Sequence, residues 1–440
     1  MATANVAIGP MLIGRFGSAT QPLTYDQCEA MFFAPCYDPE QVQTAYNEQP
    51  LFNQGINGAG QTIVIVDSFG SPTIKSDLAT FDAEFNLPAP PSFTIIQPAG
   101  KVKYDSTNAT DVGWAGEATL DVEWSHSMAP GANILLVETP VAETEGTAGF
   151  PQIVKAENYV INHHLGQVIS QSFGATEPTF PSAASIYGLR SAYLNAFKHH
   201  VTVLAATGDA GATDYSNVAG TLLYTYPVVD WPDSDPLVTA VGGTLLSLLP
   251  DGQRTQPDRV CNSSTNYAFN NAFFGTPGPL AIAGNGGTST VFARPSYQDG
   301  VASVVGDHRG VPDISMSAAC DGSVDTYQSF AGQPAGWYVS CGTSEATPLF
   351  AGIVALADQV AGHSLGLINP ALYTLSAAQA PGLVDVTTGN NDVSFLQPAL
   401  VTVKGFQAAP GYDLASGVGT VDAALFVPEL AQAAGGGNGG

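Results

Sequence analysis

Positive charge is scarce in this sequence. Its 440 residues contain 12 Lys and Arg against 38 Asp and Glu, which gives a formal net charge of −26. Such a surface repels the phosphates of nucleic acids and the anionic headgroups of membranes, so we expect neither as a partner. Repulsion among the carboxylates weakens as they take up protons in acid. The composition therefore fits either simple solubility or a secreted protein adapted to acid.

Long apolar runs and a leader sequence are also lacking. No stretch reaches the roughly 18 apolar residues that a membrane span needs. Residues 1–21 do not combine a basic segment with a long apolar one, so they do not predict a signal peptide. If the protein is secreted, we expect that its leader was removed before Met1.

Cysteine is rare, and no C-x-x-C spacing indicates a zinc site. Cys28 and Cys36 bracket a short loop, Cys320 and Cys341 flank an expected hairpin, and Cys261 is left over. Two disulfides and one buried thiol would suit an oxidising compartment. The sequence alone does not fix the pairing.

The order of apolar runs and amphipathic segments predicts an α/β fold. Strands are expected at 61–70, 132–138, 167–174, 201–211 and 237–244, and helices at 76–85, 113–128, 152–164 and 191–200. Strands that alternate with helices at this spacing indicate a doubly wound, mostly parallel sheet flanked by helices. Ligands of such sheets bind at the carboxyl ends of the strands.

Two possible nucleophiles lie three residues apart in "SCGTSEATP", residues 340–348. Ser344 is expected at the first turn of a long helix, where free backbone N–H groups can stabilise an oxyanion. A serine at this position also serves as an ordinary helix cap. The Gly-Thr before Ser344 and the Ala-Thr-Pro after Glu345 favour the nucleophile over the cap.

The histidine that usually activates a serine nucleophile has no counterpart here. "IVIVDSFG" is similar to the aspartate strand of subtilisins and would nominate Asp67, but no His-Gly-Thr-His segment accompanies it. His126 lies on a predicted helix without flanking Gly and Thr. We therefore interpret Asp67 as a structural residue at a strand end.

Carboxylates offer a different base. Glu117 and Asp121 are four residues apart on one predicted helix, so they share a face and can titrate as a coupled pair. A solvated acidic helix face would have the same spacing. Asp209, in "AATGDAG" at a strand end, could donate to an oxyanion when protonated, or could simply form a turn beside Gly. Both carboxylate interpretations point to chemistry in acid.

Together these motifs resemble the sedolisin family, the serine-carboxyl peptidases. The matching stretches run in family order from about residue 37 to 422: GEATLDVEWSHSMAPGANI, SQSFGATE, AATGDAG, YPVVDWPDSDPLVTAVGGT, GNGGTSTVFARPSYQ, RGVPDISMSA, CGTSEATPLFAGI and DVTTG…APGYDLASGVGT. The resemblance implies a subtilisin-like fold and a peptidase active in acid, either an endopeptidase or a tripeptidyl peptidase.

The resemblance also implies a role for each candidate residue. Ser344 would be the nucleophile, Glu117 its general base, Asp121 the residue that orients Glu117, and Asp209 the oxyanion donor beside the Ser344 N–H. The "SQSFG" strand would pair with an extended polypeptide substrate through Ser172, Phe173 and Gly174.

A structural calcium ion is implied by the C-terminal motif, at about residues 383–422. Calcium prefers six or more oxygen ligands. The implied ligands are the side chains of Asp385 and Asp413 and the carbonyls of Val386, Ala409 and Gly411. Ala409 stands where the family often has Gly, and two aspartates in a Gly-rich segment could equally form turns.

The expected organisation follows from these matches. Residues 1–36 would be an N-terminal arm or the remnant of a linker to a removed prodomain, residues 37–430 the peptidase domain, and residues 431–440 a flexible Gly-rich tail. Cys341 replaces a small family residue, and a Cys320–Cys341 disulfide is favoured over a reactive thiol. We expect a secreted monomer in an acidic setting. The alternatives are an inactive, calcium-stabilised binding module and a hydrolase of other esters or amides.

Overall fold

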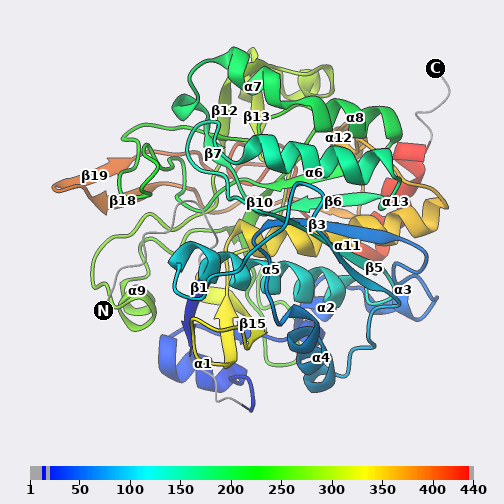
Figure 1. Cartoon of the computed structure of the whole chain (residues 1–440). Helices are drawn as coiled ribbons and strands as arrows, with labels where there is room; N and C mark the ends of the chain where they lie inside the picture. Colours follow the sequence, from blue (N-terminus) through cyan, green and yellow to red (C-terminus); the bar gives the residue numbers. More distant parts are fainter. Residues whose placement is uncertain (1–11, 16–19, 436–440) are drawn as a thin grey trace.

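An eight-stranded, mostly parallel sheet forms the centre of the molecule (Figure 1). The computed structural model describes residues 12–15 and 20–435. Along the sheet the strands run β11-β10-β8-β6-β3-β5-β4, with β14 also paired to β10, and the β10–β11 pair is antiparallel. The strands are β3 (Thr62–Ser68), β4 (Phe93–Ile96), β5 (Asn133–Thr139), β6 (Val168–Gln171), β8 (Thr202–Ala206), β10 (Thr239–Leu245), β11 (Arg259–Val260) and β14 (Ile314–Ser317).

Helices cover both faces of this sheet because its central strands are apolar on both sides. In β3, Ile63 and Ile65 belong to the core under one helical layer, whereas Val64 and Val66 belong to the core under the other. The first layer contains α4 (Ile74–Phe85), α5 (Ala109–Met128), α11 (Thr343–Ala361) and α13 (Ala423–Gly435), and the second contains α6 (Phe150–Asn162) and α8 (Ser191–His199) (Figure 1). The predicted α/β fold is confirmed.

Element boundaries differ from the sequence-based expectation where caps and turns decide them. Helix α5 begins at Ala109 rather than near residue 113, because the Asn108 side chain accepts a hydrogen bond from Thr110 N and caps it. Strands β6 and β8 end at Gln171 and Ala206, earlier than predicted. The residues that follow turn away from the sheet and line a pocket.

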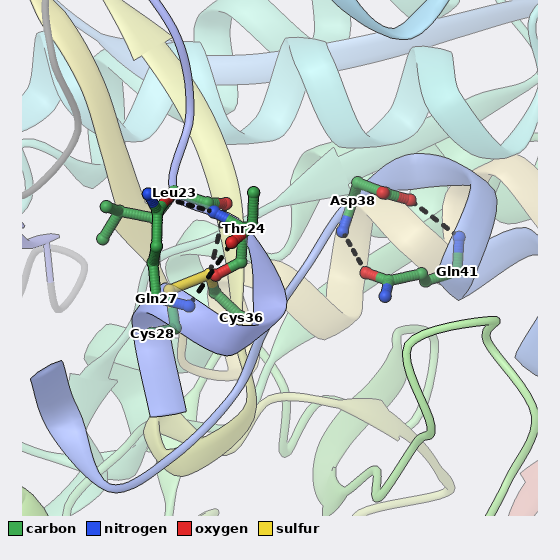
Figure 2. Close-up of a disulfide and its surroundings, with 7 residues drawn as sticks. All are labelled: Leu23, Thr24, Gln27, Cys28, Cys36, Asp38 and Gln41. Atoms are coloured by element: carbon green, nitrogen blue, oxygen red, sulfur yellow. Dashed lines mark hydrogen bonds between the residues drawn. A yellow bond between two sulfur atoms is a disulfide. The ribbon is translucent and has the colours of Figure 1, made fainter. Parts of the chain in front are cut away.

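A second sheet, in the order β1-β16-β15-β2, lies beside the main one. Its strands are β1 (Leu12–Arg15), β2 (Cys36–Tyr37), β15 (Ser323–Gln328) and β16 (Gly336–Ser340). Figure 2 shows the Cys28–Cys36 disulfide that ties helix α1 (Tyr25–Phe32) to β2, next to the capping residues Thr24 and Asp38. The second disulfide joins Cys320 and Cys341, and Cys261 is a buried free thiol.

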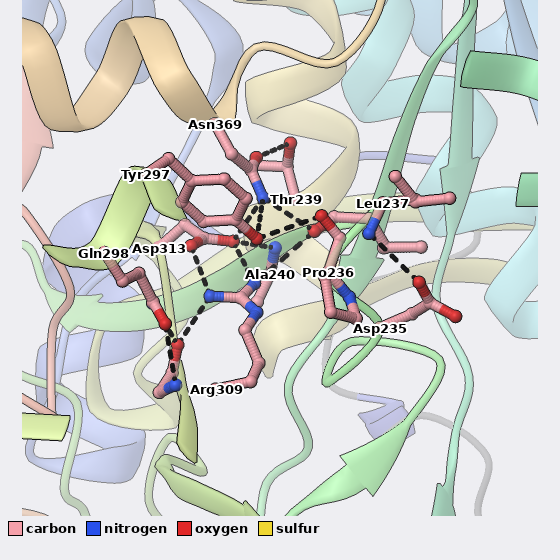
Figure 3. A network of polar contacts seen from close by, with 12 residues as sticks. Asp235, Pro236, Leu237, Thr239, Ala240, Tyr297, Gln298, Arg309, Asp313 and Asn369 are labelled. Carbon is pink, nitrogen blue, oxygen red and sulfur yellow. Dashed lines mark hydrogen bonds and ion pairs between the residues drawn. The ribbon is translucent and has the colours of Figure 1, made fainter. Parts of the chain in front are cut away.

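A buried ion pair connects the sheet to the C-terminal segment (Figure 3). Arg309 and Asp313 are fully buried and paired. Asp313 also accepts from the backbone N–H of Ala240 in β10 and from the Tyr373 hydroxyl. The Asp313 carbonyl accepts from Val418 N, so the loop with the predicted calcium ligands rests on this network.

The C-terminal helix and a number of shorter elements complete the fold. Helix α13 continues to Gly435, into the predicted tail, because Leu430 and Ala431 are buried, and residues 436–440 of that tail lie outside the described residues. The other helices are α2 (Pro39–Ala45), α3 (Gln49–Phe52), α7 (Ala183–Leu189), α9 (Tyr267–Phe274), α10 (Ala302–Val305) and α12 (Asn369–Ala377). The other strands are β7 (Ala175–Thr176), β9 (Asp230–Trp231), β12 (Gly287–Ala293), β13 (His308–Val311), β17 (Leu383–Val384), β18 (Val393–Leu396), β19 (Leu400–Val403) and β20 (Thr420–Val421).

Candidate active site

Ser344 lies in the first turn of α11, directly after the strand β16 and a tight turn. Gly342 makes this turn possible, because its φ of 106° is a conformation that L side chains rarely adopt. Ser344 is only 4% exposed and lines a pocket at the carboxyl ends of the parallel strands. Cys341, the other candidate in this segment, is buried in the disulfide with Cys320, so it holds the turn instead of offering a thiolate.

Glu117 and Asp121 lie on the neighbouring helix α5, which packs along α11. Both side chains are fully buried, so the alternative of a solvated acidic helix face is wrong. Ser172, directly after β6, links this pair to the nucleophile. Its hydroxyl donates to Asp121 Oδ1 at 2.9 Å and lies 3.5 Å from the carbonyl oxygen of Ser344.

Burial dominates the electrostatics of this acidic pair. It raises the pKa of Glu117 well above the usual range, and the nearby carboxyls of Asp67 and Asp209 raise it further. Burial, Glu117 and Asp67 raise the pKa of Asp121 in the same way. The hydroxyls of Ser344 and Ser172 oppose the shift at Glu117, although neither Glu117 oxygen has a partner in strict hydrogen-bond geometry.

Asp209 follows β8 and faces the same turn of α11. Its Oδ1 accepts from the backbone N–H of Thr343 at 2.7 Å. Burial raises the pKa of Asp209 to about 6, against the lowering effect of the Thr343 contacts. A Cβ at Gly342 would lie 2.7 Å from Asp209 Oδ2. The turn therefore needs glycine both for its backbone conformation and for the approach of this carboxyl group.

The structure thus brings all four predicted catalytic residues to one place. Ser344, Asp209 and the predicted substrate-binding residues Ser172, Phe173 and Gly174 line a single pocket. β6 ends at Gln171 and the next pairing begins at Ala175, so the backbone of 172–174 lies between two strand ladders. Phe173 differs from the expectation in one respect, because its side chain is 3% exposed and packs into the core.

Two acids in this pocket were missed by the sequence analysis. Asp214 and Asp230 line the same pocket, and Asp230 lies beside Gly174, where an added Cβ would be 3.2 Å from Asp230 Cβ. Burial raises the pKa of both carboxyls, and a hydrogen bond joins them. "TDYS" and "VVDWP" carry no signal that separates a pocket acid from a turn acid; only folding shows that both face the space beside Ser344.

Asp67 also lies nearer to the site than expected. It is 1% exposed near the end of β3, in register with Glu138 of β5. Burial and then Glu138 raise its pKa to about 8. The interpretation of Asp67 as a strand-end residue agrees with this position, but the carboxyl group also acts electrostatically on Glu117 and Asp121.

The predicted calcium ligands come from two segments that the β17–β20 pairing brings side by side. Asp385 Oδ2 accepts from Gly411 N, and Asp413 Oδ2 accepts from Ala409 N. Ser416 Oγ donates to Asp413 Oδ1 and lies 3.5 Å from the carbonyl oxygen of Val386. These hard oxygen donors are chemically suited to Ca²⁺. Across residues 12–15 and 20–435, no three His, Cys, Asp or Glu side chains are grouped as for a metal ion, and this set has only two carboxylates.

Comparison with known proteins finds relatives along most of the chain. Residues 106–372 match the sequence model of the subtilase family. Kumamolisin from Bacillus sp. (strain MN-32) is 30% identical over 437 residues, which cover 94% of this chain and 69% of that protein. Tripeptidyl-peptidase 1 from Homo sapiens is 32% identical over 324 residues, which cover 70% of this chain and 50% of that protein.

A solved structure matches at the level of the fold and the sequence. Pseudomonas sedolisin, a serine-carboxyl proteinase complexed with two molecules of pseudo-iodotyrostatin, superposes with a TM-score of 0.69 and 26% identity, covering 90% of this chain and 97% of the other. The chain therefore belongs to the subtilase family and, within it, to the sedolisin family of serine peptidases. Within the described part of the chain, no helix has both the length and the apolar character of a membrane span.

Proposed function

We propose that this protein is an acid-active serine-carboxyl peptidase with Ser344 as its nucleophile. The observation that carries the proposal is the convergence of Ser344, Asp209 and the buried Glu117–Asp121 pair around one pocket at the carboxyl ends of the parallel strands. The four residues come from α11, the loop after β8, and α5, which are far apart in the sequence. All of them lie within the residues that match the subtilase family.

The first half of the reaction forms an ester with Ser344. Because burial raises the pKa of Glu117, only a fraction of the molecules carry it ionised in acid; in these its carboxylate takes the proton of Ser344 Oγ while this oxygen attacks the carbonyl carbon of the scissile peptide bond. The carbonyl oxygen becomes negatively charged, and it accepts hydrogen bonds from the backbone N–H of Ser344 and from the protonated carboxyl group of Asp209. Glu117 then returns the proton to the leaving amine as the C–N bond breaks.

The second half reverses these roles with water. Glu117 takes a proton from water, whose oxygen attacks the ester carbon, and Ser344 leaves as the restored hydroxyl. Asp121 holds a proton while Glu117 is ionised, because two buried anions this close repel each other. Asp209 requires acid, since its pKa is about 6 and only its protonated form can donate.

A proteolysis assay with paired variants tests these roles. At about pH 4, Ser344→Ala and Glu117→Gln should each remove cleavage of an unfolded polypeptide. Glu123→Gln is the matched control, because Glu123 is also fully buried on α5 but accepts from Tyr327 N and has Asp77, Asp82 and Asp325 as its charged neighbours instead of the catalytic residues. If Ser344→Ala cleaves the polypeptide as fast as the unmodified protein, Ser344 is not the nucleophile. If the unmodified protein cleaves esters but no peptide, the alternative of a non-peptide hydrolase is favoured. If it turns over neither, the alternative of an inactive binding module is favoured.

The two acids in the pocket give the proposed substrate a chemical preference. Asp214 and Asp230 would pair with a cationic side chain of the residue before the scissile bond, releasing the proton that they share. We expect peptides with Lys or Arg at this position to be cleaved faster than those with Leu. Asp230→Asn should reduce this preference about tenfold, while equal rates for Lys and Leu in the unmodified protein would contradict the assignment.

Calcium would stabilise the C-terminal segment through Asp385, Asp413 and the carbonyls of Val386, Ala409 and Gly411. Because Asp413 also holds backbone N–H groups, its loss would destabilise the protein without any ion. The sharper test is the dependence of Tm on added Ca²⁺ in Asp385→Ala, with Asp392→Ala in the β18–β19 hairpin as control. If added Ca²⁺ raises the Tm equally in the unmodified protein, in Asp385→Ala and in Asp392→Ala, this calcium site is excluded.

We further propose a secreted, monomeric protein in an acidic setting, with polypeptides as its substrates. The two disulfides support an oxidising compartment. Mass determination of the protein purified from culture medium, together with light scattering, would test secretion, processing and oligomeric state.

A further inference from the structure

An apolar surface borders the pocket beside Ser344. Five large side chains on it are exposed, between 46% for Leu222 and 65% for Leu396. Monomeric proteins rarely leave such clusters uncovered unless they bind a partner. We call this surface the rim patch; it consists of Val218, Leu222, Tyr226, Leu396 and Leu400.

The rim patch has two halves that are joined by hydrogen bonds. Leu396 and Leu400 lie opposite each other near the tip of the β18–β19 hairpin. Gln397, between them, accepts from Leu223 N at 2.8 Å and donates to Leu223 O at 3.0 Å. Leu223 belongs to the loop that carries the other half, so these hydrogen bonds hold the tip against that loop.

The loop half continues directly into the pocket wall. Tyr215 pairs with Leu223 across this loop, and Asp214 accepts from Tyr224 N through its carbonyl. Asp214 and Tyr215 line the same pocket as Ser344. A polypeptide whose scissile bond lies at Ser344 therefore meets an apolar surface immediately beyond the pocket.

The hairpin is held firmly enough to serve as a binding surface, although Figure 1 shows that it projects from the body of the molecule. Val393, Phe395 and Val403 on its inner face are buried against Ala212 and Ala283. The backbone N–H of Ala212 donates to Asn391 O at 3.1 Å, so the base of the hairpin adjoins the segment that starts at Asp209. Apolar residues on the outer side of the tip are thus displayed from a packed base.

We infer that the rim patch is an exosite that binds apolar side chains of the polypeptide substrate outside the pocket. This inference rests on the proposed peptidase function. Continuity with the pocket identifies the occupant as the substrate itself, and the chemistry of the patch favours unfolded chains rich in Leu, Val and aromatic residues. The buried apolar area would strengthen the binding of long substrates and leave short peptides unaffected.

Binding to an inactive protein tests the exosite separately from catalysis. In a Ser344→Ala background, the Kd of fluorescein-labelled oxidised insulin B chain is measured at about pH 4. Leu396→Ser/Leu400→Ser should raise this Kd about tenfold, or 1.4 kcal/mol. Val218→Ser/Tyr226→Ser, on the other half, should do the same if the hairpin variant fails to fold. Leu425→Ser is the control, because Leu425 is 44% exposed on the distant helix α13.

A second measurement compares long and short substrates in the active protein. The hairpin variant should lose kcat/KM for insulin B chain and keep it for a short peptide that fills only the pocket. Unchanged Kd values in both double variants, or an equal loss for the short peptide, would overturn the exosite. So would light scattering that shows the patch mediating a dimer of this chain. Failure of the unmodified protein to cleave the short peptide would instead overturn the proposed function, and the Kd comparison would still stand.

Discussion

Replacing Asp209 by Asn separates the two requirements that the site places on this position. Asp209 Oδ1 accepts from Thr343 N, and the second oxygen must carry a proton to stabilise the oxyanion. An asparagine meets both needs at every pH, since its carbonyl oxygen accepts from Thr343 N and its NH₂ group donates. We therefore expect Asp209→Asn to fold normally and to stay active at a pH where the unmodified protein has lost its donor.

The size of the effect follows from the pKa of Asp209, which is about 6. At pH 8 roughly one Asp209 in a hundred is protonated, and a lost oxyanion donor costs about 10²- to 10³-fold in kcat. The kcat/KM of the unmodified protein should accordingly fall as pH rises through 6. Asp209→Asn should keep its activity through this range, whereas Asp209→Ala should be weak at every pH.

The assay is a pH–rate profile from about pH 3 to pH 9 with a fluorogenic peptide for the three proteins. Circular dichroism at each pH confirms that they remain folded. If Asp209→Asn loses activity over the same pH range as the unmodified protein, the titrating group is not Asp209, and the argument for a protonated oxyanion donor fails.

Three further predictions follow from the same packing. Gly342→Ala should reduce kcat strongly and change KM little in steady-state kinetics, because the added Cβ would displace the Asp209 carboxyl group. A normal kcat would contradict the close approach of Asp209 to Gly342. Arg309→Met should lower the free energy of unfolding by about 3–5 kcal/mol in urea titrations, because it leaves Asp313 buried without its ion pair; a loss below about 1 kcal/mol would contradict this. The pKa of Asp67 is about 8 in the folded state and 3.8 in the unfolded state, so between these values the folded state binds the proton more tightly. The stability that this group contributes is therefore present in acid and is lost as the pH rises from 3.8 to about 8. Calorimetry should show a Tm that decreases from acid toward pH 8, smaller in slope for Asp67→Asn, and a constant Tm would refute the shift.

Much of the fold could be predicted because local patterns and global packing agree. "QTIVIVDSFG" is a short apolar run between turns, and it forms the central strand β3. Its alternate residues pack under different helical layers, as a strand of a doubly wound sheet requires. The spacing of Glu117 and Asp121 fixed their common helix face, although only the structure shows that this face is buried against α11.

Features that depend on distant contacts were not predictable. Asp214 and Asp230 come from different segments and share a pocket because β9 and the loop after Asp209 meet. The β18–β19 hairpin interrupts the C-terminal motif, and only its contacts with Leu223 place its tip beside the active site. The position of Asp67 relative to the Glu117–Asp121 pair likewise depends on the packing of α5 against β3.

Trapping the acyl-enzyme tests the central claim most directly. The protein is mixed at about pH 4 with an activated ester of a peptide, quenched in acid, and digested for mass spectrometry. The account predicts one acyl adduct, located on Ser344, that is absent in Glu117→Gln and present in Glu123→Gln. An adduct on another residue, or peptide cleavage without any adduct on Ser344, would contradict it.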